Sequence, residues 1–83
     1  ENVQNYLKNI RENFKLMENF DLENIESMMR EELKELNIKP KEGFQGTRIA
    51  VTGTKISPPL FESIFALGKP ATIARLAEMI ENL

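Results

Sequence analysis

The chain has 83 residues, which leaves room for one domain with a small core. It contains no cysteine and no histidine, so disulfide frameworks, the usual zinc ligand sets and triads built on imidazole are excluded. Acids outnumber bases by 13 to 11, a net charge of -2, which shows none of the basic excess common in nucleic-acid-binding domains. No apolar run approaches the roughly 18 residues of a membrane span, and the chain reads as soluble.

The first residues also lack the basic and apolar segments of a signal peptide. The chain does not begin with methionine, which suggests a processed protein or a piece of a longer one.

Apolar residues recur at helical spacing in the first segment and predict a helix over residues 2–18. Asp21 is placed to cap a second helix, with Glu23 near the positive end of its dipole. Only residues 19–20 join the two helices, so we expect an antiparallel hairpin. The two apolar faces consist of Val3, Leu7, Ile10, Phe14 and Met17, and of Leu22, Ile25, Met29, Leu33 and Leu36.

Helix breakers follow the second helix. Pro40 ends that helix or follows its end, and Gly43 and Gly46 predict a loop. We place a boundary at residues 38–43. It divides one domain into a helical hairpin, residues 1–42, and a helical subdomain, residues 43–83.

The stretch Thr47–Gly53 is ambiguous. Its β-branched residues favour a strand, while its length and terminal glycine also suit a short helix with a left-handed end. A lone strand would find no partner among helical segments and would leave its backbone unpaired. We therefore predict a helix here.

Two further helices complete the chain. Ser57 followed by Pro58 is a helix-start signal, and we predict a helix over residues 58–67 that Gly68 closes in the left-handed conformation. Pro70 starts the last helix, which continues to the carboxyl end. The predicted fold class is all-α, a small bundle of about five helices.

Catalytic chemistry finds little support in the sequence. Lys55 near Ser57 is the closest approach to a Ser-Lys pair, and a solvated lysine beside a capping serine is the favoured interpretation. The four methionines could form an adaptable binding surface, but core packing is favoured.

The most informative stretch is residues 43–68, which read GFQGTRIAVTGTKISPPLFESIFALG. It resembles the carboxyl-terminal anticodon-binding domain of bacterial glutamyl-tRNA synthetases. The resemblance covers residues 43–83, while residues 1–42 share only a helical pattern. It rests on matches in order and spacing at Arg48, Thr52-Gly53, Ser57-Pro58, Leu60-Phe61-Glu62, Leu67-Gly68-Lys69 and Ile73-Ala74-Arg75-Leu76.

The resemblance implies an RNA site. By motif position, Gln45, Arg48 and Phe61 correspond to contacts with the middle anticodon base, and Ser57, Pro58 and Leu60 to contacts with the first. Unstacked loop bases are commonly bound by aromatic faces, guanidinium planes and hydrogen bonds, which these residue types can supply. Without the resemblance, Phe61 reads as core, Arg48 as a surface cation, and Ser57 and Pro58 as a helix cap.

The resemblance further implies a role in selecting glutamate tRNA through its anticodon loop. The catalytic domains would precede this region in the parent chain and use ATP and Mg²⁺, so we expect no catalysis and no cofactor in this chain. We expect a cytoplasmic protein that binds neither DNA nor membranes. The alternative is a non-catalytic helical module for protein-protein interaction.

Overall fold

Amphipathic helices make up the fold. The computed structural model describes residues 2–53 and 59–82, and within these ranges the chain forms helices and no strand, which confirms the all-α prediction. None of these helices has the length and apolarity needed to cross a bilayer. The helices are α1 (Asn2–Leu16), α2 (Leu22–Leu36), α3 (Pro40–Thr52), α4 (Leu60–Leu67) and α5 (Lys69–Glu81).

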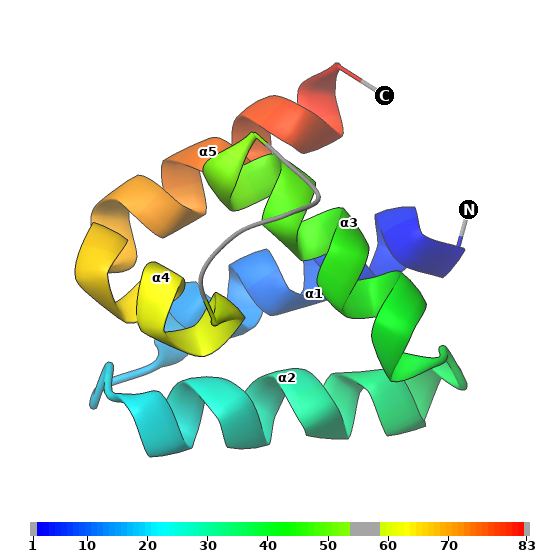
Figure 1. Cartoon of the computed structure of the whole chain (residues 1–83), viewed down its shortest axis with the longest axis horizontal. Helices are drawn as coiled ribbons and strands as arrows, with labels where there is room; N and C mark the ends of the chain where they lie inside the picture. Colours follow the sequence, from blue (N-terminus) through cyan, green and yellow to red (C-terminus); the bar gives the residue numbers. More distant parts are fainter. Residues whose placement is uncertain (1, 54–58, 83) are drawn as a thin grey trace.

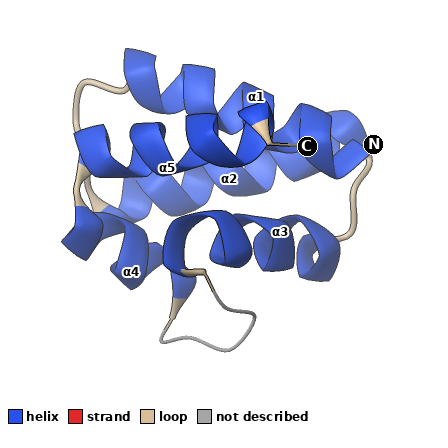
Figure 2. Ribbon diagram, turned by 90° about the horizontal axis from the view of Figure 1, so that it is seen from above, coloured by secondary structure: helices blue, strands red, loops and turns tan. Residues whose placement is uncertain are grey.

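Helix α1 packs against α2, α3 and α5. It runs antiparallel to α2, as the short connection predicted (Figure 1). Helices α3 and α4 contact each other and both contact α2, and they lie next to each other on the same side of the molecule in Figure 2. The face that α3 and α4 share with α2 is therefore built from three consecutive helices.

The core is apolar and draws on all five helices. From α1 it takes the predicted residues Leu7, Ile10 and Phe14, and also Tyr6, which the heptad-like spacing did not include. Tyr6 is fully buried, and its hydroxyl donates to the backbone carbonyl of Met29 at 3.1 Å. All four methionines belong to this core or pack against it, as predicted.

The start of α2 follows the predicted cap. The Asp21 carboxylate accepts a hydrogen bond from the backbone N–H of Asn24 at 2.9 Å, and Glu23 lies in the first turn. Helix α1 ends at Leu16, two residues earlier than expected. Beyond its end, the Lys69 ammonium donates to the carbonyl of Met17, so the amino end of α5 supplies a cation to the negative end of α1.

The predicted loop at Gly43 and Gly46 was wrong, because both glycines lie inside α3. Pro40 follows the end of α2, one of the two alternatives that the sequence left open, and it lies in the first turn of α3. A Cβ atom at Gly43 would lie 2.3 Å from Leu33 Cδ2 and 3.3 Å from Tyr6 Cε2. The glycine thus permits close approach of α3 to α1 and α2. The helical reading of Thr47–Gly53 is confirmed, and Gly53 has the expected left-handed backbone at φ 79°.

The division of the chain at residues 38–43 remains a prediction. Both proposed parts contribute to one hydrophobic cluster.

Helices α4 and α5 begin close to the predicted positions. Helix α4 starts at Leu60 rather than 58, and α5 starts at Lys69, one residue before Pro70. Gly68 alone joins them, and its backbone lies at φ 95° and ψ 159°. The positive φ was expected, but ψ is extended, outside the left-handed helical region that we predicted.

Candidate nucleic-acid interface

Two predicted site residues lie on α3. Gln45 is exposed and Arg48 is half-buried. They are three positions apart, so their side chains share one face of the helix. Thr52 Oγ1 donates to the Arg48 carbonyl at 2.7 Å, one turn before the end of α3. This face of α3 therefore carries a carboxamide and a guanidinium next to each other.

Two more predicted residues open α4, which contacts α3. Leu60 is 3% exposed and packs in the core, whereas Phe61 is half-buried. The structure therefore presents Phe61 to a ligand and buries Leu60. Pro59 stands at the N-cap without a side-chain hydrogen bond, so the first-turn N–H groups of α4 are not capped by it. Ser57 and Pro58, the other two predicted contacts, lie outside the described residues.

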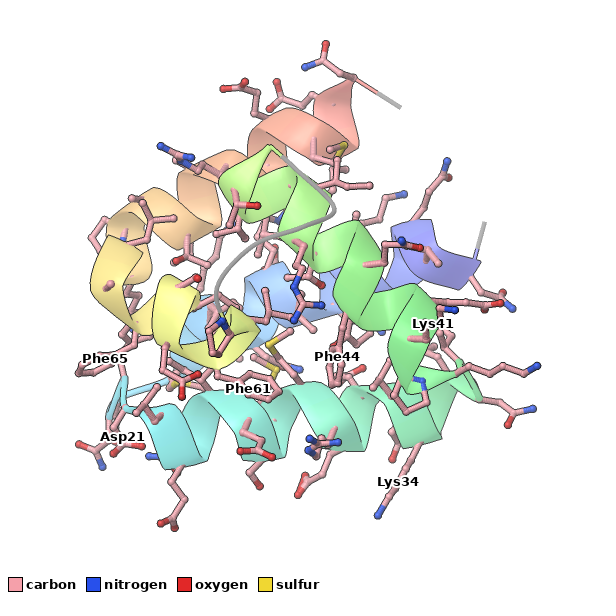
Figure 3. All side chains as sticks on the ribbon, in the orientation of Figure 1. Asp21, Lys34, Lys41, Phe44, Phe61 and Phe65 are labelled. Carbon is pink, nitrogen blue, oxygen red and sulfur yellow. The ribbon has the colours of Figure 1, made fainter. Side chains whose placement is uncertain are left out.

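An aromatic pair joins the two helices. The rings of Phe44 on α3 and Phe61 on α4 meet edge to face, with centroids 5.4 Å apart and an interplanar angle of 86°. Phe44 is also half-buried, and Figure 3 shows both rings facing the space between α3, α4 and α2. The aromatic surface at this site therefore comprises two rings at right angles, one of which holds the other in place.

A cation from α2 completes the cluster. Arg30 Cζ lies 5.5 Å from the centroid of the Phe44 ring and 5.7 Å from that of the Phe61 ring. Arg30 Nε also donates to Glu26 Oε2 at 2.7 Å, one turn earlier on α2. The guanidinium is thus in contact with two rings and a carboxylate. We call Arg30, Phe44 and Phe61 the Arg-Phe cluster.

Further basic residues lie near this cluster although the chain is slightly acidic overall. Lys34 on α2 and Lys41 on α3 are both exposed and lie toward the same end of the molecule (Figure 3). Lys34 and Arg30 line a surface hollow of about 260 Å³ together with Leu33, Asn37, Ile38 and Pro40. Arg30 and Lys34 thus place two cations beside one hollow, on a helix that also carries acidic residues.

Sequence reasoning missed Arg30 and Phe44. Phe44 stands beside Gln45 in the motif-bearing stretch, but a single phenylalanine gives no sign of its ring contacts. Arg30 lies 14 residues before Phe44 and 31 before Phe61, on a helix for which the sequence showed only an amphipathic pattern. Only the packing of α2 against α3 and α4 brings these residues together.

The sequence of this chain matches a family model and several known proteins. A family model described as an anticodon binding domain matches residues 1–80. A glutamate–tRNA ligase of Kocuria rhizophila is 44% identical over 68 residues, which cover 81% of this chain and 13% of the relative. One of Roseiflexus castenholzii is 36% identical over 77 residues, 93% of this chain and 15% of the relative.

A third relative is glutamate–tRNA ligase 2 of Thermosipho melanesiensis, 36% identical over 75 residues. That match covers 90% of this chain and 16% of the relative, so the chain spans about a sixth or less of the length of these proteins. No solved structure gives a significant match. Because the family model extends over nearly the whole chain, including the first two helices, the chain belongs to the family of anticodon-binding domains.

Proposed function

We propose that this chain reads the anticodon loop of glutamate tRNA as the carboxyl-terminal part of a glutamate–tRNA ligase. One observation carries the proposal: in a chain of the anticodon-binding family, Phe61, Arg48 and Gln45 come from two helices in direct contact. An aromatic face, a guanidinium and a carboxamide are the groups that proteins use to bind an unstacked RNA base.

The residues divide by base. For the middle base, Phe61 offers a stacking face, Arg48 a plane and donors, and Gln45 both a donor and an acceptor. For the first base, Leu60 is buried as a residue and keeps only the role that the family resemblance gives it. Ser57 and Pro58 keep the role at the first base that the family resemblance gives them.

The ligase reaction belongs to the rest of the parent chain. ATP and Mg²⁺ would bind there, and the partners of this domain are the catalytic domains and glutamate tRNA, in the cytoplasm. We expect the isolated chain to give only background in a glutamate-dependent pyrophosphate exchange assay. Exchange above a no-protein control would contradict this assignment.

The test of anticodon reading is a titration with RNA stem-loops. One loop carries the glutamate anticodon and a second is altered at the middle base. Wild type should prefer the first, and Arg48→Ala should bind it about 5- to 150-fold more weakly, with reduced preference, because a base contact is worth about 1–3 kcal/mol. Equal wild-type affinity for the two loops would show that this domain alone does not read that base.

A second candidate, a helical protein-interaction module, has one observation in its favour. Leu16 is 79% exposed and Phe65 48% exposed, so two large apolar side chains are available to a protein partner. Self-association that is insensitive to salt, without stem-loop binding, would favour this function. Stem-loop binding that weakens as salt rises would favour the first, because phosphate contacts release counterions.

A further inference from the structure

Arg30 lies outside every predicted contact, on a helix that supplied none of the predicted site residues. Its side chain is 50% exposed, so it belongs to the surface rather than the core. It nevertheless contacts both rings of the site. A surface arginine held by two aromatic rings and a carboxylate has lost much of its conformational freedom before any ligand arrives.

The ion pair with Glu26 does not account for this arrangement. It uses only Nε of Arg30, and its partner side chain is 47% exposed. Exposed i,i+4 pairs contribute about 0.3–0.5 kcal/mol, which is small compared with the entropy lost when two long side chains are ordered. Within the described part of the chain, neither Nη nitrogen of Arg30 has a hydrogen-bond partner. Four N–H donors therefore remain in a fixed fork.

The chemistry of that fork selects an anionic oxygen ligand. The two rings lie against the guanidinium and Glu26 occupies Nε, so the edge formed by the two Nη nitrogens is what a ligand can reach. Such an edge matches the paired oxygens of a phosphate group. Lys34 lines the adjoining hollow and adds a second positive charge.

We propose that Arg30 binds a backbone phosphate of the RNA loop whose bases contact α3 and α4, and so extends the interface onto α2. The proposal rests on the function proposed above. In this division, Arg48 contributes base specificity and Arg30 contributes affinity independent of sequence. The Arg-Phe cluster places the base contact and the phosphate contact side by side. Phe61 contacts Arg30 directly, and the exposed part of its ring remains open to a base.

The experiment measures the affinity of both stem-loops across a series of salt concentrations. Arg30→Ala should weaken binding of both loops to the same extent, about tenfold, since a hydrogen bond to a charged group is worth about 1.5 kcal/mol or more. It should also lower the slope of log affinity against log salt by about 1. Arg30→Lys, which keeps the charge but not the fork, should retain the slope and lose part of the affinity.

Arg11→Ala is the matched control. Arg11 is also an arginine that donates through Nε to a glutamate on its own helix, Glu12 at 3.1 Å, but it contacts no ring among the described residues. Its salt slope should equal that of wild type. Glu26→Gln tests the phosphate contact without changing Arg30. Glutamine keeps an acceptor for Arg30 Nε but removes a negative charge near the proposed phosphate. Affinity for both stem-loops should therefore rise a few-fold.

Each outcome decides the matter. An unchanged salt slope in Arg30→Ala, or unchanged or weaker binding in Glu26→Gln, would overturn the phosphate contact while wild-type binding preserves the proposed function. Loss of preference for the middle base at an unchanged slope would make Arg30 a base reader instead. A wild-type domain that binds neither loop would overturn both proposals.

Discussion

The edge of one ring faces the plane of the other where Phe44 and Phe61 meet, 5.4 Å apart between centroids. Phe44 comes from α3 and Phe61 from α4, so the contact fixes the position of a proposed base-stacking ring by a residue of the neighbouring helix. Edge-to-face pairs contribute about 0.5–1.5 kcal/mol beyond the area they bury. The Phe61 ring is therefore held in place by the fold itself.

Phe61→Leu should separate stacking from packing. Leucine keeps most of the apolar volume but has no aromatic face, so the loss of stability should stay near 1–2 kcal/mol. Affinity for the glutamate stem-loop should fall about 5- to 150-fold, the value of one base-aromatic stack. Fluorescence titrations together with thermal melts measure both quantities.

Phe65→Leu is the control for that variant. Phe65 lies one turn further along α4, is 48% exposed and stacks on Phe20 rather than on Phe44. Its replacement should leave RNA affinity unchanged. If Phe61→Leu also bound as tightly as wild type, Phe61 would be a packing residue only.

Gly43→Ala tests the close approach of α3 to the rest of the fold. Alanine is the better helix former by about 1 kcal/mol, so an open site would be stabilised. Here the new methyl group would overlap Leu33 Cδ2 and press on Tyr6, both buried, and overpacking costs about 1–3 kcal/mol. We expect net destabilisation, measured by urea unfolding.

Gly46→Ala serves as its comparison. Its methyl group would lie 2.7 Å from Val3 Cγ1 alone, on a half-buried side chain near the start of α1 that has room to move. Its cost should be smaller than that of Gly43→Ala. A Gly43→Ala variant more stable than wild type would show that the helices can separate at little cost.

Tyr6 should make stability depend on pH in the alkaline range. Burial, with a contribution from the negative charge of Glu32, raises the pKa of the Tyr6 hydroxyl above its ordinary value of about 10. The folded state therefore holds this proton more tightly than the unfolded chain does. Its contribution is fully present below about pH 10 and is lost as the pH rises from there toward the raised pKa.

Tyr6→Phe isolates that contribution. At neutral pH it should be less stable by about 0.5–1.5 kcal/mol, because the hydrogen bond to Met29 is lost. Between about pH 9 and 11 it should lose less stability than wild type, whose slope can reach about 1.4 kcal/mol per pH unit above pH 10. Parallel slopes in urea unfolding would contradict a buried, protonated Tyr6.

Asp21→Ala should destabilise the domain through α2. The carboxylate satisfies the backbone N–H of Asn24, and loss of such a cap costs about 0.5–2 kcal/mol. A cost of about 1 kcal/mol corresponds to a fall in Tm of roughly 4–8 °C for a domain of this size. Asp21→Asn keeps an acceptor and should melt close to wild type, whereas equal melting of the alanine variant and wild type would argue against the cap.

Local features were the ones that the sequence could predict. The apolar face of α1 and the Asp21 cap depend on residues within a few positions of one another, and both are confirmed. The start of α3 could not be found in this way. From its neighbours in sequence, Gly43 is predicted to break a helix. In the fold, the absence of a side chain at Gly43 lets α3 approach Leu33 and Tyr6 closely.

The candidate site shows the same limit. The motif indicated Gln45, Arg48 and Phe61, and these residues lie on two helices that contact each other. Arg30 gave no signal because its contacts with Phe44 and Phe61 join three helices. Periodicity predicts which face of a helix is buried, but it does not predict which side chain of another helix lies against that face.

Gly68 has a consequence for how related sequences can vary. It is the last cap of α4 and the first of α5 at once, at φ 95° and ψ 159°, a conformation open almost exclusively to glycine. Only one residue joins the two helices. Any other amino acid at position 68 would therefore require a different angle between α4 and α5, or a longer connection between them. Chains of this family that lack glycine at this position should therefore carry an inserted residue beside it. Otherwise α4 would change its orientation, and the side chain at position 61 would pack against a different residue.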